Sequence, residues 1–167
     1  MNKNETIERI KAYRVNIDTL TNSAKALIPS REVSLCYTAL QRSKMFLGKV
    51  LGELGTPTPY PQSDNAKSPV IEKQAEHTEQ TVFDDVDLNG QVMKVKYLRA
   101  EIEKIGEELY EDLIRGDDDL EIVVGKSTEP QTDYYKTSLF KDSTYTSLVE
   151  AKMWLGMELD RISNEKK

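Results

Sequence analysis

The segment YTALQRSKMFLG (residues 37–48) returns later in the chain as YTSLVEAKMWLG (residues 145–156). The two copies align without a gap, and continuing them to residues 54 and 162 keeps Tyr, Thr, Leu, Lys, Met, Leu, Gly and Leu in register. An internal repeat of this kind indicates two copies of one structural unit. The repeat therefore predicts a chain built from two related halves.

The first half has the pattern of two amphipathic helices. Apolar residues between positions 5 and 27 recur three, four or seven apart, which is one face of a helix. Pro29 ends that helix, and Ser30 is suited to be the N-cap of a second helix that runs to about residue 54. Two helices joined by so few residues form an antiparallel hairpin. We predict a helical hairpin over residues 1–55.

The second half repeats this pattern around two additional segments. Aligning Arg14 with Arg99 matches the apolar positions of the first helix to those of a helix from about residue 92 to 113. The second copy of the repeated phrase then lies in a final helix over residues 143–162. We predict a second hairpin over residues 91–167.

The additional segments are a linker and an insertion. Residues 56–90 contain four prolines and many polar side chains, which predicts an extended linker or a strap on the surface, and Asn89-Gly90 near its end is typical of a tight β-hairpin. Within residues 115–140, the stretches LEIVV and DYYKTSLF favour two strands around a turn. The predicted fold is mainly α: two tandem antiparallel helical hairpins with a small β insertion in the second half.

The second helix of each hairpin carries small or apolar side chains on a second face: Cys36, Ala39, Ser43, Phe46 and Val50 in one copy, and Ser147, Ala151 and Trp154, joined by Glu158, in the other. Because a hairpin alone buries little surface, the two hairpins should pack on each other and on other chains. Gly48 and Gly156 each cost about 1 kcal/mol against alanine in mid-helix, which predicts close approach of a neighbouring backbone. Lys44 and Lys152 interrupt the apolar stripe; they either snorkel into water or contact a ligand.

Composition excludes several classes of function. The 167 residues carry a formal net charge of −6, which argues against a general DNA- or RNA-binding protein. No apolar run is long enough to span a bilayer, and the N-terminus lacks the apolar core of a signal peptide. The single cysteine, Cys36, fits a reducing, cytoplasmic compartment.

The residues do not assemble into a catalytic or metal site. His77 is the only histidine and falls in the polar linker, so neither a histidine-based triad nor a metal cluster is expected. The acidic run at residues 116–121 lacks the ligand spacing of a calcium loop, and there is no glycine-rich phosphate loop. We predict a protein that is not an enzyme and that needs no cofactor.

The start of the second helix has residues of the kind that bind anions. Ser30, Arg31 and Ser34 lie where free backbone amides point outward, and helix N-termini bind phosphate groups by that geometry. Glu32 beside them disfavours an anion, and N-capping explains Ser30 without a ligand. On these residues alone we favour capping over a bound anion.

The segment IPSREVSLCYTALQRSKMFLGKVLGELGTPTPYPQS resembles the helical-hairpin domain shared by phage anti-CBASS and anti-Thoeris sponge proteins. In that family the turn carries Ser-Arg-Glu, then Ser-Leu, a threonine and a Met-Trp-like pair; here these are Ser30, Arg31, Glu32, Ser34, Leu35, Thr38, Met45 and Phe46. The second copy is similar to the later part of the motif, at Thr146, Leu148, Glu150, Ala151, Met153 and Trp154. The resemblance covers residues 5–60 well and residues 92–162 in part.

The resemblance implies an oligomeric helical protein of the host cytoplasm that binds immune signalling nucleotides and does not cleave them. The implied ligands are cyclic dinucleotides, cyclic trinucleotides or cyclised ADP-ribose isomers, held between subunits of a homo-oligomer. The residues expected to contact them are Ser30, Arg31, Ser34 and Thr38 at phosphates and ribose, and Tyr13 or Tyr37 stacked on a base.

The second half departs from the motif, because the positions of Arg31, Glu32 and Ser34 are taken by Leu139, Phe140 and Asp142. Its site is therefore either lost or rebuilt from Arg99, Ser143 and Thr146. The alternative function is a structural or protein-interaction module in which the helical faces bind a partner protein and no small molecule. An enzyme that degrades the messenger is a third, weaker hypothesis, since the chain lacks a catalytic set.

Overall fold

The computed structural model describes residues 2–56, 85–115 and 132–165, with the side chains of residues 85–87 and 132–136 excepted. These residues form helices α1 (Lys3–Lys25), α2 (Arg31–Glu53), α4 (Asp85–Leu109) and α6 (Thr132–Glu165), and α4 continues into a π-helical segment η2 (Tyr110–Arg115). The mainly α fold is thus confirmed, and the described ranges contain no strand.

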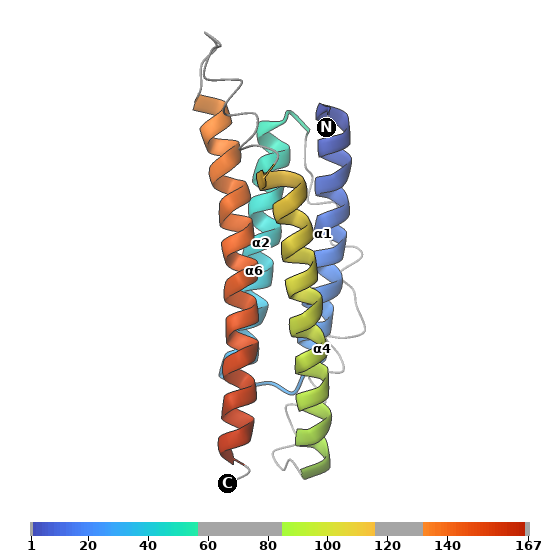
Figure 1. Ribbon diagram of the computed structural model, residues 1–167, viewed down its shortest axis with the longest axis vertical. Coiled ribbons are helices and arrows are strands. Elements are labelled where there is room, and N and C mark those ends of the chain that lie inside the picture. The colour runs from blue at the N-terminus through green and yellow to red at the C-terminus, as the bar shows by residue number, and fades with distance from the viewer. Residues whose placement is uncertain (1, 57–84, 116–131, 166–167) are drawn as a thin grey trace.

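The helices lie side by side as a bundle (Figure 1). Helix α1 packs against α2 and α4, and α6 packs against the same two helices. Figure 1 shows that each helix runs antiparallel to both of its neighbours. The core is formed by side chains from all four helices, among them Ile17, Leu40, Leu47, Ile102, Leu148 and Leu155, each at most 1 % exposed.

The ends of the first two helices follow from local chemistry. Asn2 and Glu5 form a capping box at the start of α1, in which each side chain accepts from the other residue's backbone N–H. Ser30 caps α2, as predicted, by accepting a hydrogen bond from the Val33 amide. Gly55 has a φ of +79°, the left-handed conformation that glycine adopts most readily after a helix.

Both strand predictions are wrong where they fall on described residues. Asn89 and Gly90 lie inside α4, and residues 132–140 belong to α6. Tertiary packing overrides the strand preference of this aromatic-rich stretch, because the Phe140 ring stacks on Phe46 of α2 with ring centroids 6.3 Å apart. The remaining insertion, which contains LEIVV, and linker residues 57–84 lie outside the described residues.

The second face of the repeated helix is buried between α2 and α6. Ala39, Ser43 and Ala151 are fully buried there, and Ser147 is nearly so. Side chains this small let two helices approach closely. The two copies of the repeated phrase therefore form the central contact of the bundle.

The two mid-helix glycines are covered by arginines, so the expected close backbone approach is not what the structure shows. A Cβ atom at Gly48 would have the Arg14 guanidinium as its nearest neighbour, with Nη2 at 3.6 Å. At Gly156 the nearest atom would be Nη2 of Arg99, at 3.4 Å. Glycine leaves room for a planar guanidinium to lie across the helix.

Candidate functional site

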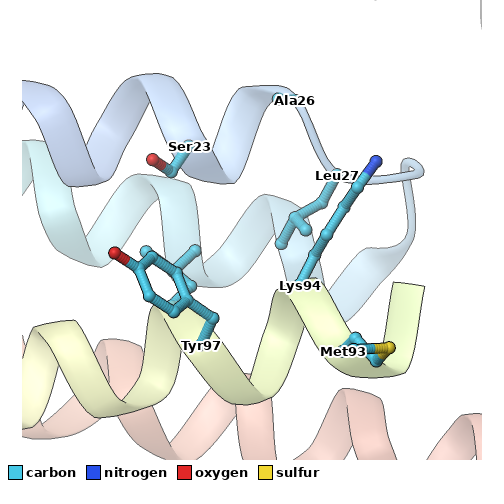
Figure 2. Close-up of a pocket in the computed structure, with 7 residues that line it drawn as sticks. Ser23, Ala26, Leu27, Met93, Lys94 and Tyr97 are labelled. Carbon is cyan, nitrogen blue, oxygen red and sulfur yellow. The ribbon is translucent and has the colours of Figure 1, made fainter. Parts of the chain in front are cut away.

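A hollow of about 370 Å³ opens between the end of α1 and residues 93–98 of α4 (Figure 2). Its lining residues are Ser23 from α1, Ala26 and Leu27 from the connection that follows α1, and Met93, Lys94, Tyr97 and Leu98 from α4. We refer to it as the Tyr97 hollow. Ligand pockets typically measure about 300–1,000 Å³, so its size suits one nucleoside or a compact metabolite.

Two large side chains of the Tyr97 hollow are unusually exposed. Met93 is 74 % exposed and Tyr97 is 69 % exposed. In Figure 2 the side chains of Tyr97 and Lys94 extend from α4 toward α1, on either side of Leu27. An exposed aromatic ring can stack on a flat base, and a nearby ammonium can bind a phosphate.

A second hollow, of about 350 Å³, lies between α1 and the end of α4 together with η2. Its lining residues are Arg9, Tyr13, Glu107, Glu108, Glu111 and Asp112, and we call it the acidic hollow. The Tyr13 hydroxyl donates to Oδ2 of Asp112 at 2.6 Å, and Nη1 of Arg9 reaches the same oxygen at 3.2 Å. Burial, with the Asp112 hydrogen bond, raises the pKa of Tyr13 well above its usual value.

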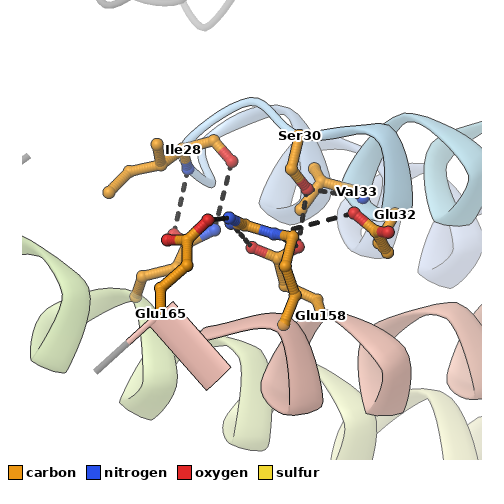
Figure 3. A network of polar contacts seen from close by, with 8 residues as sticks. Ile28, Ser30, Glu32, Val33, Glu158 and Glu165 are labelled. Carbon is orange, nitrogen blue, oxygen red and sulfur yellow. Dashed lines mark hydrogen bonds and ion pairs between the residues drawn. The ribbon is translucent and has the colours of Figure 1, made fainter. Parts of the chain in front are cut away.

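A polar cluster ties the start of α2 to the end of α6 (Figure 3). The Ser30 hydroxyl donates to the fully buried carboxylate of Glu158 at 2.6 Å. Arg161 donates to Glu158 through Nε at 3.0 Å and Nη2 at 2.6 Å. It also pairs with Glu165 at 2.6 Å and lies 3.6 Å from Glu32, and its pKa is raised chiefly by the hydrogen bond to Glu158. We call Ser30, Glu32, Glu158, Arg161 and Glu165 the end cluster.

The end cluster changes the interpretation of the predicted anion site. The Ser30 hydroxyl donates to Glu158, and its oxygen accepts from the Val33 amide of α2. The Glu32 carboxylate lies in the same cluster, 3.6 Å from Arg161. An anion at this helix start would therefore meet carboxylates. Arg31, Ser34 and Thr38 are exposed, and Thr38 donates to the Ser34 carbonyl within the helix. The geometry favours capping over phosphate binding.

The other predicted contacts are distributed along the bundle. Tyr13 belongs to the acidic hollow, and Tyr37 accepts a hydrogen bond from Gln41 and lies under the Lys25 ammonium. Ser143 and Thr146 lie on α6, at least 12 residues from the Glu158 that contacts Ser30, which is about 18 Å at 1.5 Å per residue. Arg99 covers Gly156, and its Nε makes no hydrogen bond within the described part of the chain. The structure does not bring these residues into one site.

Both repeated lysines form cross-helix ion pairs, which neither sequence-based alternative included. Lys44 lies 2.6 Å from an oxygen of Asp18, and Lys152 lies 2.8 Å from one of Glu103. Lys152 lowers the pKa of Glu103 below its ordinary value, mainly through this hydrogen bond. The pattern that could have revealed the pairs is the alignment of Arg14 with Arg99, which also places Asp18 on Glu103.

Sequence reasoning missed three residues that shape these sites. Tyr97 and Lys94 lie off the apolar stripe of their helix, which marks them as surface residues but does not show that a hollow lies beside them. Gln91 is 2 % exposed and clamps the loop before α2: its amide accepts from the Ile28 N–H at 3.0 Å and donates to the Ile28 carbonyl at 3.1 Å. Such a contact over 63 positions leaves no local pattern.

The described residues offer neither a reactive thiol nor a cluster of metal ligands. Cys36 is buried, and burial raises the pKa of its thiol to about 12, so it is not a reactive nucleophile. Among the described residues, no three His, Cys, Asp or Glu side chains come together in a way that would hold a metal ion. No helix in the described ranges has the apolar stretch that a membrane span requires.

Comparisons with known proteins leave the site to be interpreted from its own geometry. No family model, no curated protein and no solved structure matches this chain.

Proposed function

We propose that this protein binds a small nucleotide messenger in the Tyr97 hollow and sequesters it without cleaving it. The observation that carries the proposal is the pairing of an exposed aromatic ring, Tyr97, with the Lys94 ammonium at the mouth of a mostly apolar hollow. The ligand classes are those implied by the resemblance: cyclic dinucleotides, cyclic trinucleotides or cyclised ADP-ribose isomers.

The exposed side chains support a ligand at this place. Leaving Met93 and Tyr97 in water forgoes burial worth about 1.5–3 kcal/mol per large side chain. Contiguous exposed apolar surface of this kind commonly marks a binding site. Stacking on Tyr97 would contribute about 1–3 kcal/mol per base. Ser23, whose hydroxyl donates to the Thr19 carbonyl, retains acceptor capacity toward a ribose.

The remaining part of the proposal concerns assembly and context. The hollow accommodates one nucleoside unit, so the rest of a cyclic messenger would extend out of it and contact the surface of a second copy in a homo-oligomer, with one messenger for each chain. The chain would act as two tandem helical hairpins, α1 with α2 and α4 with α6, as a phage-encoded sponge in the cytoplasm of the infected host. Lowering the free messenger concentration would then silence the host effector that the messenger activates.

Calorimetry on the full chain with a panel of these cyclic nucleotides tests the proposal. We expect one class to bind, Tyr97→Ala to weaken binding by about 1–3 kcal/mol, and Lys94→Glu to weaken it more steeply at low salt. Lys104→Glu makes the same charge change at an exposed position on α4 outside the hollow and should have little effect. Heating the complex should release the nucleotide chemically unaltered.

Other outcomes would redirect or end the proposal. If Arg31→Ala abolishes binding while Tyr97→Ala does not, the ligand sits at the start of α2, where the sequence motif predicted it. If no messenger binds, or the recovered nucleotide is hydrolysed, sequestration is wrong.

The second candidate function, a protein-interaction module, is favoured by α6. Val149, Met153 and Met157 recur every fourth residue and are 43–49 % exposed, which forms an apolar stripe on its outer face. Replacing Met153 and Met157 with Gln would then abolish capture of a partner protein without affecting nucleotide binding. Nucleotide binding that is weakened by Tyr97→Ala but not by these two substitutions would favour the sponge.

A further inference from the structure

Three sets of contacts indicate an approximate twofold axis between the helix pair α1–α2 and the helix pair α4–α6. The Arg14–Gly48 contact in one pair corresponds to Arg99–Gly156 in the other. The Lys44–Asp18 ion pair corresponds to Lys152–Glu103. Arg42 and Glu150 are equivalent positions in the two copies, and they form an ion pair with each other at 2.7 Å, as residues beside the axis would.

The same axis relates the two hollows. Adding 85 to a residue number of α1 gives its equivalent in α4 and η2, because Arg14 corresponds to Arg99. By this rule, five of the six residues lining the acidic hollow are equivalents of residues lining the Tyr97 hollow. They are Arg9, Tyr13, Glu108, Glu111 and Asp112, which correspond to Lys94, Leu98, Ser23, Ala26 and Leu27.

We infer that the two hollows are twin sites of which only the Tyr97 hollow accepts an anionic nucleotide, so that each chain binds one messenger and not two. This inference rests on the proposed function. The residues that determine the difference are Glu108, Glu111 and Asp112 in the acidic hollow, at the positions of Ser23, Ala26 and Leu27 in the other.

Charge and the lack of a stacking ring both disfavour the nucleotide in the acidic hollow. Four carboxylates line it against a single guanidinium, and that guanidinium already pairs with Asp112. A phosphate there would be repelled by carboxylates that outnumber this cation. The position equivalent to Tyr97 is Ala12, so the stacking surface is absent as well.

Transferring acidic side chains to the Tyr97 hollow provides the first test. Ser23 and Ala26 are exposed, so Ser23→Glu/Ala26→Glu should fold while reproducing Glu108 and Glu111 at their twin positions. We expect calorimetry to show messenger affinity reduced at least tenfold. Val15→Glu/Gln41→Glu adds the same charge at exposed positions outside both hollows and should change affinity less than twofold.

The reverse transfer provides the second test. One variant copies the Tyr97 hollow into the acidic hollow and keeps Arg9 as the cation. It carries the substitutions Glu8→Met, Ala12→Tyr, Tyr13→Leu, Glu108→Ser, Glu111→Ala and Asp112→Leu. We expect the stoichiometry to rise from one messenger per chain to two, and Tyr97→Ala in this background to weaken only one of the two sites.

The results separate the inference from the proposed function. A wild-type chain that binds two messengers, or a Ser23→Glu/Ala26→Glu variant with unchanged affinity, overturns the inference while leaving sequestration in place. If the six-substitution variant melts cooperatively but still binds only one messenger per chain, the inference is likewise overturned and sequestration stays in place. If that variant does not fold, the Ser23→Glu/Ala26→Glu result decides alone. A wild-type chain that binds no messenger overturns both.

Discussion

The two helix pairs keep the same inter-helix contacts and differ at their surfaces. Arg14 covers Gly48 as Arg99 covers Gly156, and both repeated lysines pair with a carboxylate on the opposite helix. By contrast, of the large apolar side chains that are exposed among the described residues, only Val15 lies in the first pair. The residues that make contacts between helices therefore stay similar in both copies of the repeated unit, whereas the residues on its surface can differ.

Matched core truncations should show the largest effect. Leu40 and Leu148 occupy equivalent positions and are at most 1 % exposed. Leu40→Ala and Leu148→Ala should each lower the free energy of unfolding by about 2–5 kcal/mol, through lost burial and the cavity that remains. Denaturant unfolding measures both, and values within about 1 kcal/mol of each other would show that the two halves contribute equally to the stability of the core. A Leu148 value near zero would contradict a shared core.

The end cluster should show the next largest effect, because here the two halves differ. The equivalent of the buried Glu158 is Val50, which is also fully buried. Glu158→Ala should cost about 3 kcal/mol, since it leaves Arg161 and the Ser30 hydroxyl without their buried partner. Glu158→Val/Arg161→Met, which removes both charges, should cost far less. Equal losses for the two variants in chemical denaturation would show that packing, and not the unpaired charge, sets the cost.

The glycines should show a smaller effect of opposite sign. A Cβ at Gly48 would lie 3.6 Å from Arg14, an ordinary contact, so Gly48→Ala should stabilise the protein by up to about 1 kcal/mol through helix propensity. At Gly156 the corresponding distance is 3.4 Å, so Gly156→Ala should stabilise less. Thermal unfolding of the two variants compares them directly. A clear loss of stability at Gly48 would indicate that Arg14 cannot move.

The Lys152–Glu103 pair should show the smallest effect, visible mainly as a pH dependence. The pKa of Glu103 is lowered in the folded protein, so its contribution is present above the ordinary value of 4.5 and is lost as the pH falls through the lowered value. The difference in melting temperature between wild type and Glu103→Gln should therefore shrink below about pH 4.5. A difference that stays constant down to pH 2 would rule out the ion pair as its cause.

Local patterns predicted the elements of this fold more reliably than their limits. The amphipathic spacing around Leu40 and Leu47 predicted α2, and Ser30 predicted its start. The same approach predicted strands near Asn89 and at residues 132–140, because an Asn-Gly pair and a run of aromatic side chains are typical of hairpins and strands. Packing against another helix can override that preference. Phe140 has such a partner in Phe46.

The candidate site depended on contacts that no local pattern encodes. Ser30 carried the motif of an anion site, yet its hydroxyl meets a carboxylate 128 positions away. The exposure of Tyr97 beside Leu27, on which the proposed stacking depends, is a result of how the helices pack.

By itself, the sequence determined that this protein is helical and built from a repeated unit, because helix period and internal repetition are properties of neighbouring residues. Only the tertiary structure decided which arginine covers which glycine, which carboxylate meets Lys44 and Lys152, and which of two related hollows remains free of acid. Those outcomes depend on distances between distant segments, and packing of the whole bundle fixes them.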